Sequence, residues 1–282
     1  MQSEVYCHRI SLVNTERVAP SRDIRAMLES IFWIAPAVAA AIYGLTPLVV
    51  RSAFRVAARC NLERITLEQL PQAISQEFRR RISEFADLGF GLVGVFDCGV
   101  LTNDTRSYVA YFCHHGTNEF ANVTAMETPI GPASYFEISS RFADGSSIET
   151  NTNRVLPFLL ANPAIRVFRF PSVDEPFTLL RLHRQLTEKY APGLCALGEP
   201  RDMEIQRYAR TMEGFGPRLA KTGHLQLTDD GAAYRLTWKG AARTAWLGLW
   251  PVTFIRKAVH RHAMHMEMQS LQTRTEAALQ KA

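Results

Sequence analysis

The chain has 282 residues, of which 47% are hydrophobic and 21% are charged, so it can bury a substantial core and form one large domain or two small ones. Its formal net charge of +5 comes mostly from arginines scattered along the chain, and a nucleic-acid partner is therefore not expected. The five cysteines are odd in number and form no CxxC pair, which excludes a disulfide framework and a zinc site and is typical of a reducing compartment.

An apolar run from Ile31 to Val50 contains no charged residue and ends at Arg51. A helix of about 20 residues crosses the ~30 Å hydrocarbon core of a bilayer, so the run predicts a transmembrane helix over residues 31–50. Pro36 and Pro47 interrupt the pattern, which leaves a buried helix of a soluble core as the alternative. The predicted membrane-anchoring residues are Ile31, Phe32, Trp33, Ile34, Val49 and Val50.

The charges around this run predict an orientation. Residues 1–30 form an N-terminal tail, on either the cytoplasmic or the periplasmic side, and residues 51–66 are predicted as a basic linker helix. More arginines follow the run than precede it, and positive residues favour the cytoplasmic side of a membrane. The sequence therefore predicts a single-pass protein of a bacterial inner membrane, with the main domain in the cytoplasm.

Residues 67–240 read as a soluble α+β domain. Apolar positions from Leu67 to Leu88 recur every three or four residues, which predicts an amphipathic helix that ends at Gly89. Short segments rich in Val, Ile, Phe, Tyr and Thr follow near 91–100, 106–114, 119–126, 134–142, 146–151 and 165–170. Turn residues separate them, most sharply Asp144-Gly145, so we expect an antiparallel sheet of about five or six strands with packed helices.

Two helices and a hairpin are predicted between residues 173 and 238. This order resembles the recognition helix and wing of a winged-helix regulator, with Arg207, Arg210, Arg218 and Lys221 available to phosphate. A helix-turn-helix needs a turn of about three or four residues, whereas here a longer segment with two prolines separates the helices. A membrane-tethered winged-helix regulator is therefore an alternative function rather than the leading one.

Residues 241–282 are predicted as a Trp-rich, basic, amphipathic helix at the membrane interface. The uncharged stretch from Thr244 to Ile255 is too short to cross a bilayer, but tryptophans favour the headgroup level and nearby basic residues attract anionic lipid. The alternative is that Trp238, Trp246 and Trp250 fill the core of the soluble domain. The predicted interface residues are Trp246, Trp250, Arg256, Lys257 and Arg261.

The remaining motifs give no cofactor or metal. The glycines of Gly89-Phe-Gly-Leu-Val-Gly94 follow a helix and enter a strand, which is the reverse of a dinucleotide-binding fingerprint. His262 and His265 are the candidates for binding a metal ion, because in the histidine cluster near the C-terminus only their spacing brings two side chains together on one face of a helix. A solvated basic surface is the favoured interpretation of this cluster. A cysteine next to a histidine could form an activated nucleophile. Cys113 and His114 are adjacent in a predicted strand, however, so their side chains should point to opposite faces of the sheet.

Three short sequence segments carry a resemblance to other proteins, which covers this chain from the strand-rich core to the C-terminus. They are Phe142-Ala-Asp-Gly145 with Thr150-Asn151 after it, Leu179 through His183, and Thr237-Trp-Lys-Gly-Ala241 before Trp250-Pro251. On these residues the chain resembles a group of bacterial membrane-associated proteins with no assigned activity. The resemblance implies a membrane setting and transfers no functional residue.

These observations predict a membrane-anchored, cytoplasmic-facing interaction or ligand-binding protein, with the lipid bilayer and an unknown protein or small molecule as partners. An enzyme is the first alternative, with a site on the sheet built from His114, Asp144 and His183. Convergence of those side chains in a deep pocket would favour that alternative.

Overall fold

The structure is a computed structural model that describes residues 22–59, 62–102, 105–128, 131–155, 164–198 and 201–279. The first 21 residues, and with them most of the predicted tail, lie outside the described residues. The chain divides into two compact units, Met1–Gly44 and Leu45–Ala282, and the second contains both β-sheets.

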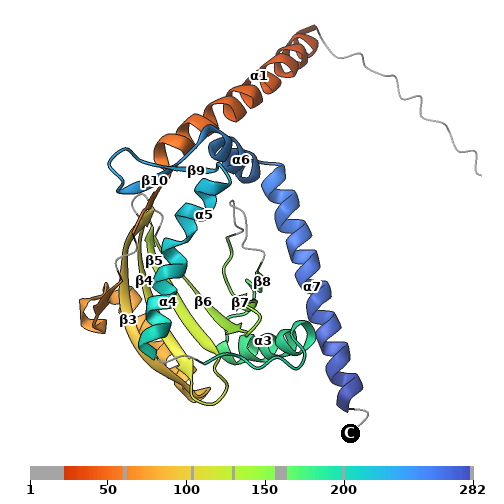
Figure 1. Cartoon of the computed structure of the whole chain (residues 1–282). Helices are drawn as coiled ribbons and strands as arrows, with labels where there is room; N and C mark the ends of the chain where they lie inside the picture. The colour runs from red at the N-terminus through yellow and green to blue at the C-terminus, as the bar shows by residue number, and fades with distance from the viewer. Residues whose placement is uncertain are drawn as a thin grey trace, which may run out of the picture. The chain divides into compact units, whose positions relative to one another are not determined.

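The predicted membrane segment is helical throughout, as part of the 32-residue helix α1 (Arg22–Ala53) (Figure 1). Neither Pro36 nor Pro47 interrupts this helix, which extends beyond the predicted bounds at both ends. Its stretch Phe32–Ala53 has a mean hydropathy of 1.8, and none of the described residues in that window is buried. Among the described residues, this is the one helix long and apolar enough to cross a membrane.

The main sheet of the second unit has seven strands. In spatial order they are β2 (Glu63–Ile65), β3 (Phe90–Thr102), β4 (Thr105–His114), β5 (Phe120–Thr128), β6 (Gly131–Arg141), β7 (Ser147–Asn151) and β8 (Ile165–Arg169). Neighbours are antiparallel except β7 and β8, which run parallel after a longer connection. The α+β class is confirmed, whereas the predicted sheet of five or six antiparallel strands was too small.

The prediction of a linker helix over residues 51–66 was wrong. Only Arg51–Ala53 continue α1, and the segment contains two three-residue strands, β1 (Arg55–Ala57) and β2. β2 pairs with β3, and β1 pairs with β10 (Ala233–Leu236), nearly 180 positions further along the chain. Pairing of backbone groups with strands formed elsewhere overrides local helix preference, and nothing in the segment's own pattern announces it.

One face of the seven-stranded sheet forms the main hydrophobic core. Phe136 and Ile138 of β6 point into this core, and so do Phe85 of α2 (Gln72–Asp87) and Leu186 of α3 (Pro176–Tyr190). The predicted helix from Leu67 is a 3-10 turn, η1 (Leu67–Gln69), followed by α2, because Pro71 stands between them.

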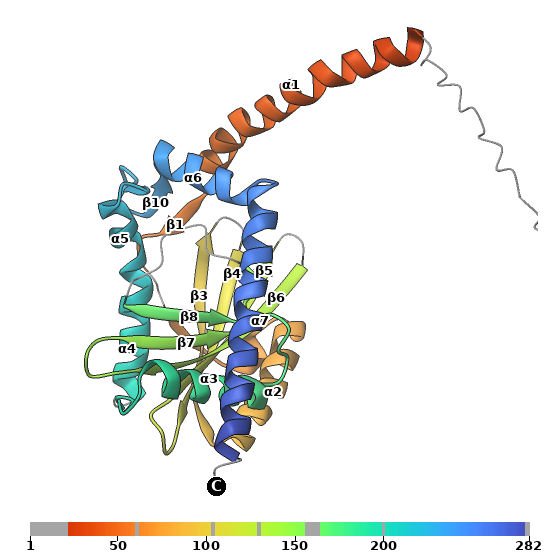
Figure 2. The same cartoon turned by 90° about the vertical axis from the view of Figure 1, so that its right-hand side faces the viewer.

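Helix α4 (Arg201–Glu213) packs on the opposite face of the sheet. Its Ile205 and Tyr208 contact a second apolar cluster formed by Val93, Phe96, Tyr111 and Phe120. Figures 1 and 2 show α4 and α7 (Val252–Leu279) on opposite sides of β6 and β7.

A three-stranded sheet with order β1-β10-β9 forms a separate small core. Leu225 of β9 (Leu225–Leu227) and Leu236 of β10 pack with Leu219 of α5 (Phe215–Lys221), and Val50 and Phe54 lie against them. Thus Val50, one of the predicted anchoring residues, is half-buried in this core, whereas Phe32, Trp33, Ile34 and Val49 are exposed. The side chain of Ile31 lies outside the described residues.

The C-terminal segment consists of α6 (Trp238–Gly248) and α7, which are separated at Leu249–Pro251. Trp238, Trp246 and Trp250 are all more than half exposed, so the alternative that they fill the core was wrong. The later part of α7 packs on the domain instead: Leu271 is buried, and Lys189 pairs with Glu267 at 2.7 Å.

Candidate functional site

The face of the sheet beneath α4 is polar at its centre. Along β6 the even-numbered residues Phe136, Ile138 and Ser140 are buried in the main core, and the odd-numbered ones face the other way. The odd-numbered side chains line a cavity of about 310 Å³ together with parts of β4, β5, β7, β8 and α4. The lining residues are Tyr111, Asn122, Tyr135, Glu137, Ser139, Arg141, Ser147, Glu149, Ile165, Arg207, Tyr208, Thr211 and Met212.

Two carboxyl groups form the floor of this cavity. Glu137 accepts hydrogen bonds from the amide nitrogens of Asn122 (3.1 Å) and Asn151 (3.0 Å), which fix its orientation from both neighbouring strands. Glu149 lies on the adjacent strand β7, where it is paired with Ser139 in the β6–β7 ladder. The strand register therefore brings together two acids that are 12 positions apart in the sequence.

Burial changes the protonation of these groups. It raises the pKa of Glu149 to about 8, with the neighbouring charge of Glu137 acting in the same direction. Burial also raises the pKa of Glu137, against the effect of the two asparagine hydrogen bonds. Burial raises the pKa of Tyr135 to about 12. At neutral pH the floor therefore offers both a carboxylic acid that can donate a hydrogen bond and a group that accepts one.

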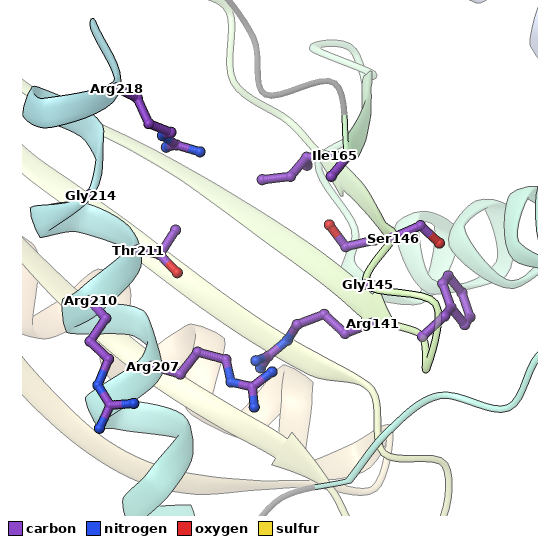
Figure 3. Close-up of a pocket in the computed structure, with 12 residues that line it drawn as sticks. Arg141, Gly145, Ser146, Ile165, Arg207, Arg210, Thr211, Gly214 and Arg218 are labelled. Carbon is purple, nitrogen blue, oxygen red and sulfur yellow. The ribbon is translucent and has the colours of Figure 1, made fainter. Parts of the chain in front are cut away.

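A second cavity of about 330 Å³ adjoins the first and is rich in arginine. Arg207, Arg210 and Arg218 come from α4 and α5, and Arg141 comes from the end of β6 on the opposite wall (Figure 3). Gly145, Ser146 and Ser147 from the β6–β7 hairpin and Ala164 and Ile165 at the start of β8 complete much of that wall. Arg141, Ser147, Ile165, Arg207 and Thr211 line both cavities, so the two form one continuous hollow.

The raised pKa of Glu149 predicts a pH-dependent stability. The folded chain holds this proton more tightly than the unfolded chain, so the contribution of Glu149 to the free energy of unfolding should be lost as pH rises from about 4.5 to about 8. The slope for one proton is at most about 1.4 kcal/mol per pH unit. In Glu149→Gln, thermal unfolding followed by circular dichroism should lose this slope.

The matched control for Glu149→Gln is Glu188→Gln, which changes an exposed glutamate of α3. This control should retain the wild-type pH dependence. An unchanged slope in Glu149→Gln would contradict the assignment of the raised pKa to that residue.

The structure does not bring together the three residues of the enzyme alternative. His183 is fully buried between Ser140 (2.9 Å from Nε2) and Thr150 (3.0 Å from Nδ1), on the core side of the sheet. His114 Nδ1 accepts hydrogen bonds from backbone N–H groups of the β4–β5 turn, and Asp144 is exposed on the β6–β7 turn, bonded to Ser146. These hydrogen-bond partners are all different, and none of the three residues lines either cavity.

The other sequence candidates also lie outside the hollow. His262 and His265 are exposed on α7, and His265 contacts Gln269. In the part of the chain that the structure describes, no group of three or more His, Cys, Asp or Glu side chains is placed to hold a metal ion. Gly89 has a positive φ of 85° in the turn from α2 into β3, which confirms that the glycine motif enters a strand.

The winged-helix alternative predicted a helix pair that the structure does not form. α3 packs in the main core, whereas α4 packs on the opposite face of the sheet, so the two do not make a helix-turn-helix. The hairpin of β9 and β10 exists, but it pairs with β1. Arg207, Arg210 and Arg218 line the second cavity, and Lys221 does not.

Sequence reasoning missed Glu137, Glu149 and Arg141. A signal for Glu137 and Arg141 was present, because polar residues occupy alternate positions 135, 137, 139 and 141 opposite the apolar face of β6. What the sequence does not give is the pairing that places β7 beside those positions and the packing that places α4 over them.

Comparison with protein-family models, curated proteins and solved structures gives no match to this chain.

Proposed function

We propose that this protein is a membrane-anchored receptor for a small polar ligand, held in a bacterial inner membrane by α1 with its domain in the cytoplasm. The observation that carries the ligand-binding part is the continuous hollow on the polar face of the sheet. A buried acid pair at its floor and arginines at its wall are costly to desolvate and contribute little to folding, which is typical of binding sites.

The apolar helix supports the anchor. Phe32, Trp33 and Ile34 are 59–73% exposed, and Val38, Leu45 and Val49 are also exposed. Large apolar side chains gathered along one helix are unfavourable in water and favourable in hydrocarbon.

A second apolar surface supports contact between the domain and the bilayer. Along the end of α6 and the first turns of α7, Trp246, Trp250, Phe254, Ile255 and Val259 are 55–74% exposed. Lys257 and Arg261, two of the predicted interface residues, are exposed beside them, whereas Arg256 is half-buried and donates to the Leu247 carbonyl. Aromatic residues next to cations are suited to the headgroup layer of an anionic membrane.

Membrane fractionation tests the anchor. The wild-type chain should stay with membranes through a high-salt wash and an alkaline carbonate wash. Val38→Lys with Ile42→Lys places two charges in the middle of the span, each costing about 2.5–3.5 kcal/mol at the centre of a membrane helix. The double variant should lose carbonate-resistant attachment and retain only salt-sensitive attachment through Arg256, Lys257 and Arg261.

Gln76→Lys with Ser83→Lys is the matched control for the lysine pair in α1. It adds the same two charges to exposed positions of α2 and should remain in the carbonate-washed membrane. Release of the wild-type chain by carbonate alone would contradict the anchor.

A further inference from the structure

The arginine-rich cavity, described above as part of the hollow, indicates the class of ligand. Arg207, Thr211, Gly214 and Arg218 recur at spacings of three or four residues from α4 into α5, so they lie along one side of the helices. Figure 3 shows Arg141 and Arg207 reaching toward each other from opposite walls. The cavity thus holds guanidinium groups from two separate elements around one space.

The lining of this cavity is strongly positive. It contains four arginines, and none of the described residues that line it is acidic. Burial lowers the pKa of Arg207, and the charges of Arg141 and Arg210 act in the same direction. Like charges held together in a concave space repel one another, and a bound anion relieves that repulsion.

The position of Arg141 is fixed by the fold. Its guanidinium carbon lies 4.6 Å from the centroid of the Phe120 ring, on the neighbouring strand β5. A stacked guanidinium keeps its edge available as a planar donor, which matches the oxygens of a phosphate group. Ser146, Ser147 and Thr211 add hydroxyl groups to the same walls.

The adjoining cavity restricts the rest of the ligand. Its floor presents Glu137 and Glu149, which accept hydrogen bonds from hydroxyl or amine groups, and Glu149 in its protonated form also donates. A ligand that fills both cavities therefore has an anionic end and a polar, hydroxyl- or amine-bearing end.

We propose that the hollow binds a phosphate-bearing small molecule, with the phosphate held by Arg141, Arg207 and Arg218 and the polar end directed toward Glu137 and Glu149. The proposal rests on the proposed function, since it names the ligand of that same site. A phosphate carries about −1.5 to −2 charges at neutral pH and so balances more of the four arginine charges than a carboxylate does. The source of the phosphate is either a soluble metabolite or the headgroup of a phospholipid.

Calorimetric titration of the full chain in a neutral detergent, at low salt, tests this proposal. Inorganic pyrophosphate should bind at one saturable site. Arg207→Gln with Arg218→Gln should weaken that binding by about tenfold or more, because two charge-assisted contacts are lost. Circular dichroism melting should show that the double variant is folded, since Arg218 is exposed and Arg207 is half-buried.

Arg79→Gln with Arg80→Gln is the matched control for loss of two charges. Both arginines are exposed on α2, which packs on the other face of the sheet, and pyrophosphate affinity should stay within about twofold. An equal loss of pyrophosphate affinity in both double variants would show that the binding depends only on the overall charge of the protein, and it would overturn the proposed site.

The same titration distinguishes the possible sources and failures. Tighter binding of soluble dihexanoyl phosphatidylglycerol than of glycerol phosphate would assign the phosphate to a lipid headgroup, and the reverse order would assign it to a metabolite. Absence of pyrophosphate and glycerol phosphate binding, or binding of an oligonucleotide alone, would overturn the proposal. Binding of glucose or choline, without binding of any anion, would also overturn the phosphate proposal but would leave the proposed small-ligand receptor intact. The membrane fractionation tests the anchor independently of these titrations.

Discussion

Replacing Phe85 with alanine is expected to lower the free energy of unfolding by about 3–5 kcal/mol, the usual cost of removing a buried aromatic ring. Phe85 is fully buried at the centre of the main core. Its ring lies 5.0 Å from that of Phe112 in a stacked arrangement, and edge-on to those of Phe90 and Phe136 at 5.5 and 6.1 Å. It therefore joins α2 to strands β3, β4 and β6, and an alanine leaves a cavity bounded by three rigid rings.

Denaturant unfolding of the detergent-solubilised chain measures this loss. Far-ultraviolet circular dichroism is the suitable probe, because Trp33, Trp238, Trp246 and Trp250 are all exposed and report poorly on the core. Phe177→Ala removes an aromatic ring that is 61% exposed on α3 and should change the free energy of unfolding by less than about 0.5 kcal/mol. Similar losses in the two variants would show that the core is not centred on Phe85.

Acidification is expected to remove about 3 kcal/mol of stability through His183. Burial lowers the pKa of this histidine to about 4, so the folded chain holds it neutral while the unfolded chain protonates it near pH 6.5. The contribution is complete above pH 6.5 and is lost as pH falls from about 6.5 to about 4. The neutral ring donates one hydrogen bond and accepts another between Ser140 and Thr150, and the charged ring could only donate.

Unfolding free energies measured between pH 4 and pH 8 test the role of His183. His183→Phe should flatten the acid limb, and it should also lower stability throughout because two buried hydroxyls lose their partner, at about 1–3 kcal/mol each. His262→Gln changes an exposed histidine of α7 and should preserve the wild-type profile. Retention of the full acid limb in His183→Phe would assign that limb to other groups.

Strands β3 to β8 could be predicted from the sequence because residues within and next to each strand mark its ends. Alternation of polar and apolar residues marks the strands, and Asp144-Gly145 marks the turn between β6 and β7, where Gly145 adopts a φ of +80°. The strands β1 and β2 could not be predicted, since three residues carry too little pattern and their partners are distant in sequence.

The candidate site was harder to predict than the fold. Arg207, Arg210 and Arg218 stood out in the sequence, but in the context of a DNA-binding helix, because helix spacing alone does not say what the helix faces. The acid pair depends on a register in which Ser139 lies opposite Glu149 and Glu137 opposite Asn151. Such a cross-strand arrangement follows from pairing, and no residue near Glu137 in sequence signals it.

The division of β6 into two faces has a consequence for the evolution of this protein's sequence. Its even-numbered residues build the core and its odd-numbered residues line the hollow, so a substitution at Tyr135, Ser139 or Arg141 alters the lining of the hollow without disturbing the packing of Phe136 and Ile138. The chemistry of the hollow can thus diverge at one set of positions while the other set maintains the fold. Variation at alternate positions of a single strand would then produce proteins of equal stability whose hollows differ in lining.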